Sequence, residues 1–268
     1  MTNPFKADVL VVKLSGKALT ADKALDALFA ALADSAANAE RTRVVLVHGG
    51  GVEVDALMRG LGRPIDRIEG LRVSPAEDMP VIAGALAGTC SLKLRGAAQR
   101  AGLMPLGLCA TDAGIGRVVP ADPRLGRVGV IEPGDSAAKR RLQALLDAGF
   151  TPVISSVGMD AAGALWNINA DDAAVASAAL LGAPLIFLSD VPGVLDANKH
   201  LFEQLNEKQA ETLIAEGVIS GGMTVKVRAA FRAAAMTGKP VAAASVFDPM
   251  LPNKLASGQL PGTTFTLE

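Results

Sequence analysis

The sequence predicts an α/β fold, a three-layer αβα sandwich in two lobes around a mostly parallel central sheet. Short, wholly apolar runs at residues 9–12, 44–47 and 185–188 alternate with segments whose apolar residues repeat at helical spacing. Strands that are apolar along their whole length are buried on both faces, as in parallel sheets that carry helices on either side. Half of the residues are hydrophobic, so the chain can supply the core that such a sandwich needs.

The remaining elements follow in a regular order. Helices are predicted at residues 25–32, 52–61 and 225–236, because apolar side chains recur there three or four positions apart. Further strands are expected at 152–154 and 241–244, where short apolar runs are rich in valine and alanine. The alternation of strands and helices indicates a sheet with helical crossovers.

One segment interrupts this order. Residues 111–133 are rich in glycine, proline and arginine and are predicted to form a hairpin that leaves the main sheet. A boundary between two lobes is expected near residues 178–182, where a helix ends. The sequence therefore divides into residues 1–178 and residues 179–268.

Composition excludes several classes of function. Lys and Arg number 26 against 27 Asp and Glu, so the chain lacks the basic surplus typical of nucleic-acid-binding proteins. The apolar runs are too short for a spanning helix, and no secretory leader opens the sequence. We therefore expect a cytoplasmic protein with no nucleic-acid or membrane partner.

The most informative segment runs VVLVHGGG and ends on Gly49, Gly50 and Gly51. A helical pattern follows at once, which predicts a buried strand, a glycine turn and the start of a helix. Glycines leave the backbone bare, so an anion can approach the amide groups at the helix start. The pattern fits an anion cradle, and it also fits a structural tight turn.

Other polar residues lie at the ends of expected elements. Lys13 is expected directly after the first strand, Arg72 follows a glycine, and Lys226 stands in the first turns of a helix. Asn167 and Asp171 belong to an NINAD segment that precedes an apolar helix. Surface charges, ordinary turns and a helix cap are the alternative explanations for each segment taken alone.

Three familiar signatures are missing from the sequence. There is no G-x-x-x-x-G-K-[ST], no G-x-G-x-x-G after a strand and no G-x-S-x-G, which argues against a P-loop enzyme, a dinucleotide-binding enzyme and a serine hydrolase. Glycine amides, two lysines, an arginine and an aspartate remain. This set suits phosphoryl transfer, which depends on positioning and charge neutralisation.

Eight collinear segments resemble the amino acid kinase family, and within it the acetylglutamate kinases. They cover nearly the whole length of the chain, and in order they are VVKLSGK, LVHGGGVEVDALM, GLRVSP, GALAGT, PVISSVG, NINADDAA, FLSDVPGVLD and GGMTVKVRAA. The resemblance implies ATP-dependent phosphorylation of the γ-carboxylate of N-acetyl-L-glutamate, the second step of arginine biosynthesis. It also implies that residues 1–178 form the acylamino-acid lobe with the dimer interface and residues 179–268 the ATP lobe.

The resemblance assigns the acceptor side residue by residue. The three glycines of the HGGG segment would face the acylated amino acid and the transferred phosphoryl group. An arginine would hold the α-carboxylate, and an asparagine would bind polar backbone groups of the substrate. The corresponding residues are Gly16, Gly49, Gly50, Gly51, Arg72 and Asn167.

The resemblance also assigns the catalytic and nucleotide-binding residues. Lys13 and Lys226 would stabilise the phosphoryl group from either side, and Asp171 would orient both lysines; Asp172 is rotated by about 100° along the helix and is disfavoured. Mg²⁺ would be held by the nucleotide, so no protein metal ligand is expected. The expected nucleotide-binding residues are Asp190, Val191, Pro192, Gly193, Val194, Leu195, Val218, Ile219, Ser220, Gly221, Gly222 and Met223.

Two features concern assembly and departures from the family. The first strand is expected to begin near residue 9, which leaves no room for the extra N-terminal helix of arginine-inhibited hexamers in the family. We therefore expect a homodimer that is insensitive to arginine. Ser15 stands where the family's turn has a glycine, and we expect the loop to be kept because serine also carries a backbone amide.

Two alternatives remain beside N-acetylglutamate phosphorylation. One is a sister kinase for another acidic substrate, such as carrier-linked aminoadipate, which should need a basic face near the site. The other is a non-catalytic sensor of an amino acid or a nucleotide, which should have lost a catalytic charge. The presence of Lys13, Asp171 and Lys226 argues against the sensor.

Overall fold

The computed structural model describes residues 7–37, 42–257, 259 and 261–267. Residues 1–6, on which the expected absence of an N-terminal helix depends, lie outside the described residues. The central sheet is built from β1 (Val9–Leu14), β2 (Arg43–His48), β5 (Pro105–Cys109), β8 (Thr151–Ser155), β11 (Leu185–Ser189), β12 (Gln204–Asn206), β13 (Val241–Ser245) and β14 (Thr263–Thr266).

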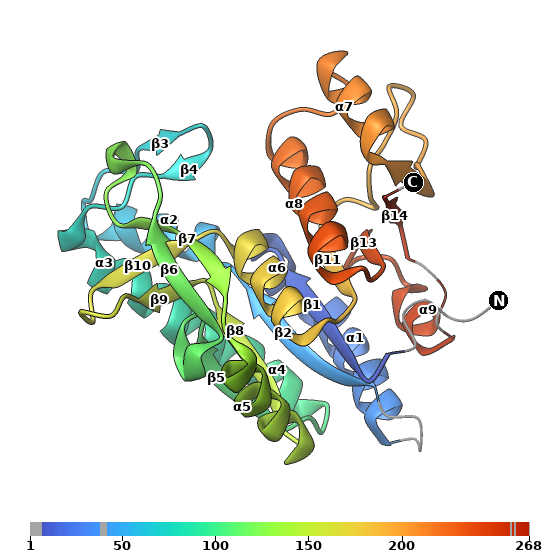
Figure 1. The fold of residues 1–268 in the computed structure, drawn as a ribbon, viewed down its shortest axis with the longest axis horizontal. Coiled ribbons are helices and arrows are strands. Elements are labelled where there is room, and N and C mark those ends of the chain that lie inside the picture. Colours follow the sequence, from blue (N-terminus) through green and yellow to red (C-terminus); the bar gives the residue numbers. More distant parts are fainter. Residues whose placement is uncertain (1–6, 38–41, 258, 260, 268) are drawn as a thin grey trace.

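These eight strands lie in the order β12-β14-β13-β11-β1-β2-β8-β5 (Figure 1). Every neighbouring pair is parallel except β13 and β14. The prediction of a mostly parallel central sheet is therefore confirmed. Strand β1 joins the two halves of the sheet, because it pairs with β2 on one side and with β11 on the other.

Helices cover both faces of the sheet and complete the three layers. The helices α1 (Asp22–Ala37), α4 (Ser91–Arg100) and α9 (Leu251–Ser257) pack on one face, where their apolar residues share a core with alternate residues of the strands. The opposite face carries α5 (Ser136–Asp147), α6 (Ala170–Leu181) and α8 (Gly222–Thr237), with α7 (Glu207–Ala215) packed against α8 and β12. The division follows from strands that are buried on both sides.

A smaller sheet stands beside the main one. Its order is β6 (Gly116–Pro120), β7 (Val128–Pro133), β10 (Leu165–Ile168) and β9 (Val157–Met159), and β6 pairs antiparallel with β7. This pair confirms the hairpin predicted at 111–133. A third core cluster joins α2 (Gly51–Gly60), α3 (Met79–Ala83) and the π-helical turn η3 (Gly84–Cys90), next to the short hairpin of β3 (Arg67–Ile68) and β4 (Leu71–Arg72). Short 3₁₀ turns complete the chain at η1 (Gly16–Thr20), η2 (Ala76–Asp78), η4 (Asp112–Gly114) and η5 (Pro123–Leu125).

The carboxyl ends of the central strands meet at one edge, where open parallel sheets bind ligands. Leu14 at the end of β1 pairs with His48 at the end of β2 and with Leu188 of β11. The prediction that Lys13 follows the first strand is wrong, because Lys13 is the fifth residue of β1 and pairs with Val47. The strand continues through Lys13 because a buried partner, described below, neutralises the ammonium.

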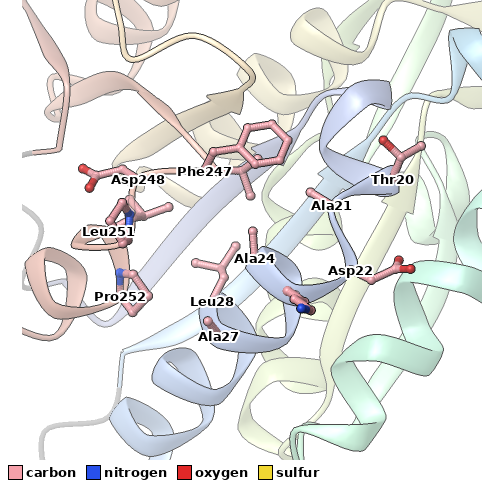
Figure 2. A pocket seen from close by; sticks show the side chains of 13 residues that line it. Thr20, Ala21, Asp22, Ala24, Ala27, Leu28, Phe247, Asp248, Leu251 and Pro252 are labelled. Atoms are coloured by element: carbon pink, nitrogen blue, oxygen red, sulfur yellow. The ribbon is translucent and has the colours of Figure 1, made fainter.

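A large pocket lies on the α1 and α9 face of the sheet (Figure 2). Its volume is about 660 Å³, and its lining includes Leu28 of α1 and Leu251 of α9, with Phe247 at its rim. It is therefore on the face opposite to α6 and α8. None of the helices in the described part of the chain has the length and hydropathy of a transmembrane span.

Candidate active site

The first charged pair of the site joins β1 to α6. Lys13 Nζ lies 2.7 Å from Asp171 Oδ1, and the two side chains are only 10% and 13% exposed. Asp171 stands in the first turn of α6. Asn169 caps this helix, and its side-chain oxygen accepts a hydrogen bond from the Asp171 amide. Asp171 Oδ1 has no aligned hydrogen-bond donor among the described residues, so charge attraction holds the pair. The pair places a cation at the carboxyl edge of the sheet, and the aspartate neutralises it.

A second lysine enters from α8. Lys226 Nζ donates a hydrogen bond to Ser189 Oγ, 2.8 Å away, at the end of β11. Burial lowers the pKa of the Lys226 ammonium, and the charge of Lys13 lowers it further, while Asp171 and Asp190 act in the opposite direction. Lys13, Asp171 and Lys226 are thus electrostatically coupled in one place, although they come from three elements far apart in the sequence.

A third lysine lies at the outer edge of the same cluster. Lys17 Nζ donates to Asp190 Oδ2 at 2.7 Å, and this hydrogen bond lowers the pKa of the Asp190 carboxyl. The Lys17 side chain is 68% exposed, so solvent weakens the pair. The contact links η1 to the loop after β11.

Asp171 and Asp172 face different partners, as their positions on a helix require. Asp172 forms an ion pair with Arg232 of α8. Burial raises the pKa of the Asp172 carboxyl, against the opposing influence of Arg232. Asp172 is therefore engaged between α6 and α8 and has no contact with either lysine of the cluster among the contacts of the described residues.

The glycine loop packs closely against its surroundings. A Cβ atom on Gly50 would overlap Cys90 Sγ of the η3 turn, and one on Gly49 would lie 3.3 Å from the Ala170 side chain. A Cβ on Gly16 would lie 3.4 Å from the Gly51 amide nitrogen, so the two glycine segments approach each other backbone to backbone. Only glycine at position 50 permits this packing.

Ser15 departs from the family's glycine and has a structural function. Its amide donates to Leu188 O at 3.0 Å, and its Oγ accepts from the Ala18 amide at 3.3 Å. The Ser15 amide is therefore already hydrogen-bonded to strand β11. That the serine keeps the family's loop stays a prediction, while the Ser15 amide itself is engaged in the protein.

The predicted substrate-binding residues Arg72 and Asn167 are linked through Ser74 beside the loop. Arg72 is buried, forms an ion pair with Asp55 of α2 and donates through Nη2 to Gly51 O at 3.2 Å. Its Nη1 atom is buried without a partner among the described residues. Asn167 Nδ2 donates to Ser74 Oγ at 3.0 Å, and Ser74 Oγ donates to the carbonyl of Arg72 at 3.2 Å.

The Asp55 carboxylate is already ionised beside Arg72. Burial acts to raise its pKa, but hydrogen bonds from Arg72 and Arg67 outweigh this and hold the pKa of the carboxyl below its ordinary value. Arg72 is thus held by one carboxylate while its Nη1 stays unused. A guanidinium in this state can donate to a second carboxylate.

The two predicted nucleotide segments line one pocket. Its volume is about 210 Å³. Gly221 of the second segment does not line it and caps α8 with a positive φ of 57°. Ser189 and Lys226 connect this region to the lysine cluster. The pocket is lined by Val191, Gly193, Val194, Leu195, Val218, Ile219, Ser220 and Met223, all of which belong to the predicted set.

The described residues contain no cluster of three or more His, Cys, Asp or Glu side chains that could hold a metal ion. The carboxylate that faces the nucleotide segments is Asp190, which Lys17 already neutralises. These donors suit a cation that stays mainly with nucleotide phosphates and water.

Sequence reasoning missed four polar residues of the site. Ser74 and Asp55 contact Arg72 or Asn167, Ser189 holds Lys226, and Lys17 pairs with Asp190. All four lie within the segments that carry the family resemblance, but their own polar side chains were given no role. The FLSD segment was a possible signal for Ser189, since a serine that ends a buried strand lies at the ligand-binding edge.

The chain is similar to known kinases over almost its whole length. The acetylglutamate kinase of Vibrio vulnificus is 47% identical over 265 residues, which cover 99% of each chain. That of Aeromonas salmonicida is 47% identical over 258 residues, 96% of this chain and 98% of the relative. Among solved structures, a protein of Streptococcus mutans has a TM-score of 0.81 at 26% identity, with 97% of this chain and 99% of that chain covered.

A model of the amino acid kinase family matches residues 8–244. The match includes the glycine loop, both lysines of the cluster and Asp171. On this match and the identity to its members, the chain belongs to the amino acid kinase family.

Proposed function

We propose that the chain transfers the γ-phosphoryl group of ATP to the γ-carboxylate of N-acetyl-L-glutamate, forming N-acetyl-L-glutamyl 5-phosphate and ADP in arginine biosynthesis. The near-full-length identity to acetylglutamate kinases supports this substrate, and the family supports the use of ATP. The observation that carries the proposal is the cluster of Lys13, Asp171 and Lys226 at one end of the sheet. It lies between a glycine loop with an arginine on one side and a glycine-bearing pocket on the other.

On the acceptor side, Arg72 binds the substrate α-carboxylate. Its unpartnered, buried Nη1 supports this role, since that atom lacks a hydrogen-bond acceptor among the described residues. Asn167, joined to Arg72 through Ser74, binds the polar groups of the acetylated backbone. The amides of the glycine loop, with that of Gly16 opposite, face the γ-carboxylate and the phosphoryl group in transfer.

On the nucleotide side, residues 190–195 and 218–223 bind ATP. Their convergence on one pocket supports the assignment, as does the link through Ser189 to Lys226. In this proposal residues 1–178 form the acceptor lobe and residues 179–268 the ATP lobe. Mg²⁺, bound by the nucleotide phosphates, neutralises part of their charge.

The chemistry needs no general base. A substrate carboxylate with a pKa near ~4.3 is already ionised at neutral pH, so it attacks without losing a proton. The barrier comes from bringing two anions together in line. Lys13 and Lys226 offset this repulsion, and Asp171 keeps the Lys13 ammonium at the edge of the sheet.

We also infer a cytoplasmic homodimer. Exposed apolar side chains, among them Leu57 of α2, Leu61 just after it and Leu92 of α4, supply surface that a second copy can cover. Light scattering at micromolar concentration should give the mass of two chains. The mass of one chain or of six would contradict this assembly.

A coupled assay of ADP release tests the proposed reaction. N-acetylglutamate should support turnover, while glutamate and free aminoadipate should support far less. Preference for aminoadipate presented on a carrier would indicate the sister kinase. Binding of N-acetylglutamate or ATP without any turnover would indicate the sensor.

A further inference from the structure

The three carbonyl groups of the glycine loop each accept a hydrogen bond from a different kind of donor. Gly49 O lies 2.9 Å from His48 Nδ1, and Gly50 O accepts from the Val54 amide at 2.9 Å. Gly51 O accepts from Arg72 Nη2 at 3.2 Å. The whole run of carbonyls is therefore anchored from within the protein.

The amides of the same loop are left free for a ligand. None of the amides of Gly49, Gly50 and Gly51 donates a hydrogen bond to another residue in the part of the chain that the structure describes. The N–H and C=O groups of a trans peptide point to opposite sides of the chain. Anchoring the Gly49 carbonyl therefore determines where the Gly50 N–H points.

The hydrogen bond to Gly49 O assigns the tautomer of His48. A carbonyl oxygen accepts only, so Nδ1 carries the proton. Burial lowers the pKa of His48 to about 4, and nearby Arg95 also acts to lower it, which keeps the ring neutral at physiological pH. Nε2 is then a bare acceptor, and it is buried without a partner among the described residues. The ring is thus a fixed donor that does not change its charge in the working range.

His48 acts from the face of the sheet opposite to the lysine cluster. It pairs with Leu14, and the pleat places Leu14 and Lys13 on opposite faces of β1. Leu14 and Leu46 belong to the core shared with α1 and α4, whereas Val11 and Val47 belong to the core shared with α6. A ring on this face does not contact the group transferred beside Lys13, which excludes the roles of base and phosphoryl ligand.

We propose that His48 is a positioning residue of the phosphoryl-transfer loop: its Nδ1–H holds the Gly49–Gly50 peptide so that the Gly50 amide faces the transferred group. This inference rests on the proposed kinase function of the same site. The Val54 amide anchors the next peptide as part of the helix, and Arg72 anchors the one after it. His48 supplies the one anchor that neither the helix nor the substrate-binding arginine provides.

Two substitutions of His48 by amide side chains distinguish the loss of the Nδ1–H donor from the loss of the ring's volume. The His48→Asn side chain places an N–H near the position of Nδ1, while His48→Gln places one near Nε2. In the ¹⁵N-labelled protein without ligands, the Gly50 amide should be rigid in the wild type and in His48→Asn. Its NMR order parameter should fall below about 0.6 in His48→Gln.

Steady-state kinetics supply the second measurement. His48→Gln should lose about tenfold in kcat, the scale of one hydrogen bond, with KM for N-acetylglutamate within about twofold of the wild type. His48→Asn should keep kcat within about threefold. Ser155→Ala is the matched control, because Ser155 is buried in register with His48 but donates to Leu108 O.

Several outcomes overturn the positioning role. They are a rigid Gly50 amide in His48→Gln, equal loss of kcat in both variants, or an equal loss in Ser155→Ala. If His48→Asn does not fold, the comparison of His48→Gln with the wild type still decides. The order parameters are measured without substrate, so a wild type that fails to turn over N-acetylglutamate would refute the proposed reaction and leave this result standing.

Discussion

The acceptor-side loop and the start of α8 use glycine in different ways. Gly50 is pressed against Cys90, and every carbonyl of its loop has a donor. An added Cβ on Gly221 or Gly222 would meet no atom within 4 Å. Gly50 is therefore fixed by packing, while the glycines at the start of α8 have open space around them. Gly193, in the other nucleotide segment, is packed against Thr263 and Leu201. Substitutions that disturb packing should accordingly be costly in the first region and mild in the second.

The largest effect is expected where the acceptor and nucleotide sides meet. Lys13→Ala removes the cation of the buried pair with Asp171, and kcat should fall by about 10²–10³ with little change in KM for N-acetylglutamate. Initial rates at saturating ATP measure this. Circular dichroism checks that the fold survives the unpaired Asp171, and a kcat near the wild-type value would refute the assigned role.

The second-largest effect is expected at Arg72, where a lysine keeps the positive charge but removes the planar guanidinium. Arg72→Lys keeps a cation but loses the planar pair of donors, so KM for N-acetylglutamate should rise by about 10- to 100-fold. Arg63→Lys is the matched control, since Arg63 pairs with Asp78 at 3.0 Å at a position that is 43% exposed. Equal rises of KM in both variants would show that Arg72 has no special role.

Alanine substitutions at Gly50 and at Gly222 test directly whether the two regions differ in packing. Gly50→Ala should destabilise the fold by about 1–3 kcal/mol, because the new methyl group overlaps Cys90 Sγ. Gly222→Ala should change stability by less than about 0.5 kcal/mol. Urea unfolding measures both, and Cys90→Ala in the Gly50→Ala background should restore part of the loss. Similar costs at the two glycines would remove the distinction between the two regions.

The smallest effect is expected at the exposed contact between η1 and the loop after β11. Lys17→Ala breaks the pair with Asp190, but the Lys17 side chain is 68% exposed, so stability should change by less than about 1 kcal/mol. The difference should shrink further at high salt. Urea unfolding at low and high ionic strength checks this; a salt-independent loss above that value would make the pair a structural element.

Much of the fold follows from local patterns in the sequence. Apolar runs predicted β1, β2, β8, β11 and β13, and the glycine and proline content of 111–133 predicted a hairpin. The antiparallel strand β14 and the short β12 were not predicted, because their pairing depends on distant partners. Lys13 was placed after β1 because a lone lysine is rarely buried, and its partner stands in a helix much later in the chain.

The candidate site divides in the same manner. The glycines, Arg72, Asn167, Lys13 and Lys226 occupy segments that the sequence marks by composition or by resemblance. Ser74 and Ser189 occupy the same kind of segment, but only their contacts in the structure show that they belong to the site. A serine becomes part of a site through distances of about a hydrogen bond, which no local pattern encodes.

The sequence by itself determined the layered architecture, the family and the positions of the glycine loops, because periodicity and motif spacing are local properties of the chain. Only the tertiary structure decided that Lys13 and Asp171 neutralise each other, that Arg72 keeps a free Nη1, and that His48 anchors the Gly49 carbonyl. These depend on strand register and helix packing, which bring together residues far apart in the chain and place them on one or the other face of the sheet.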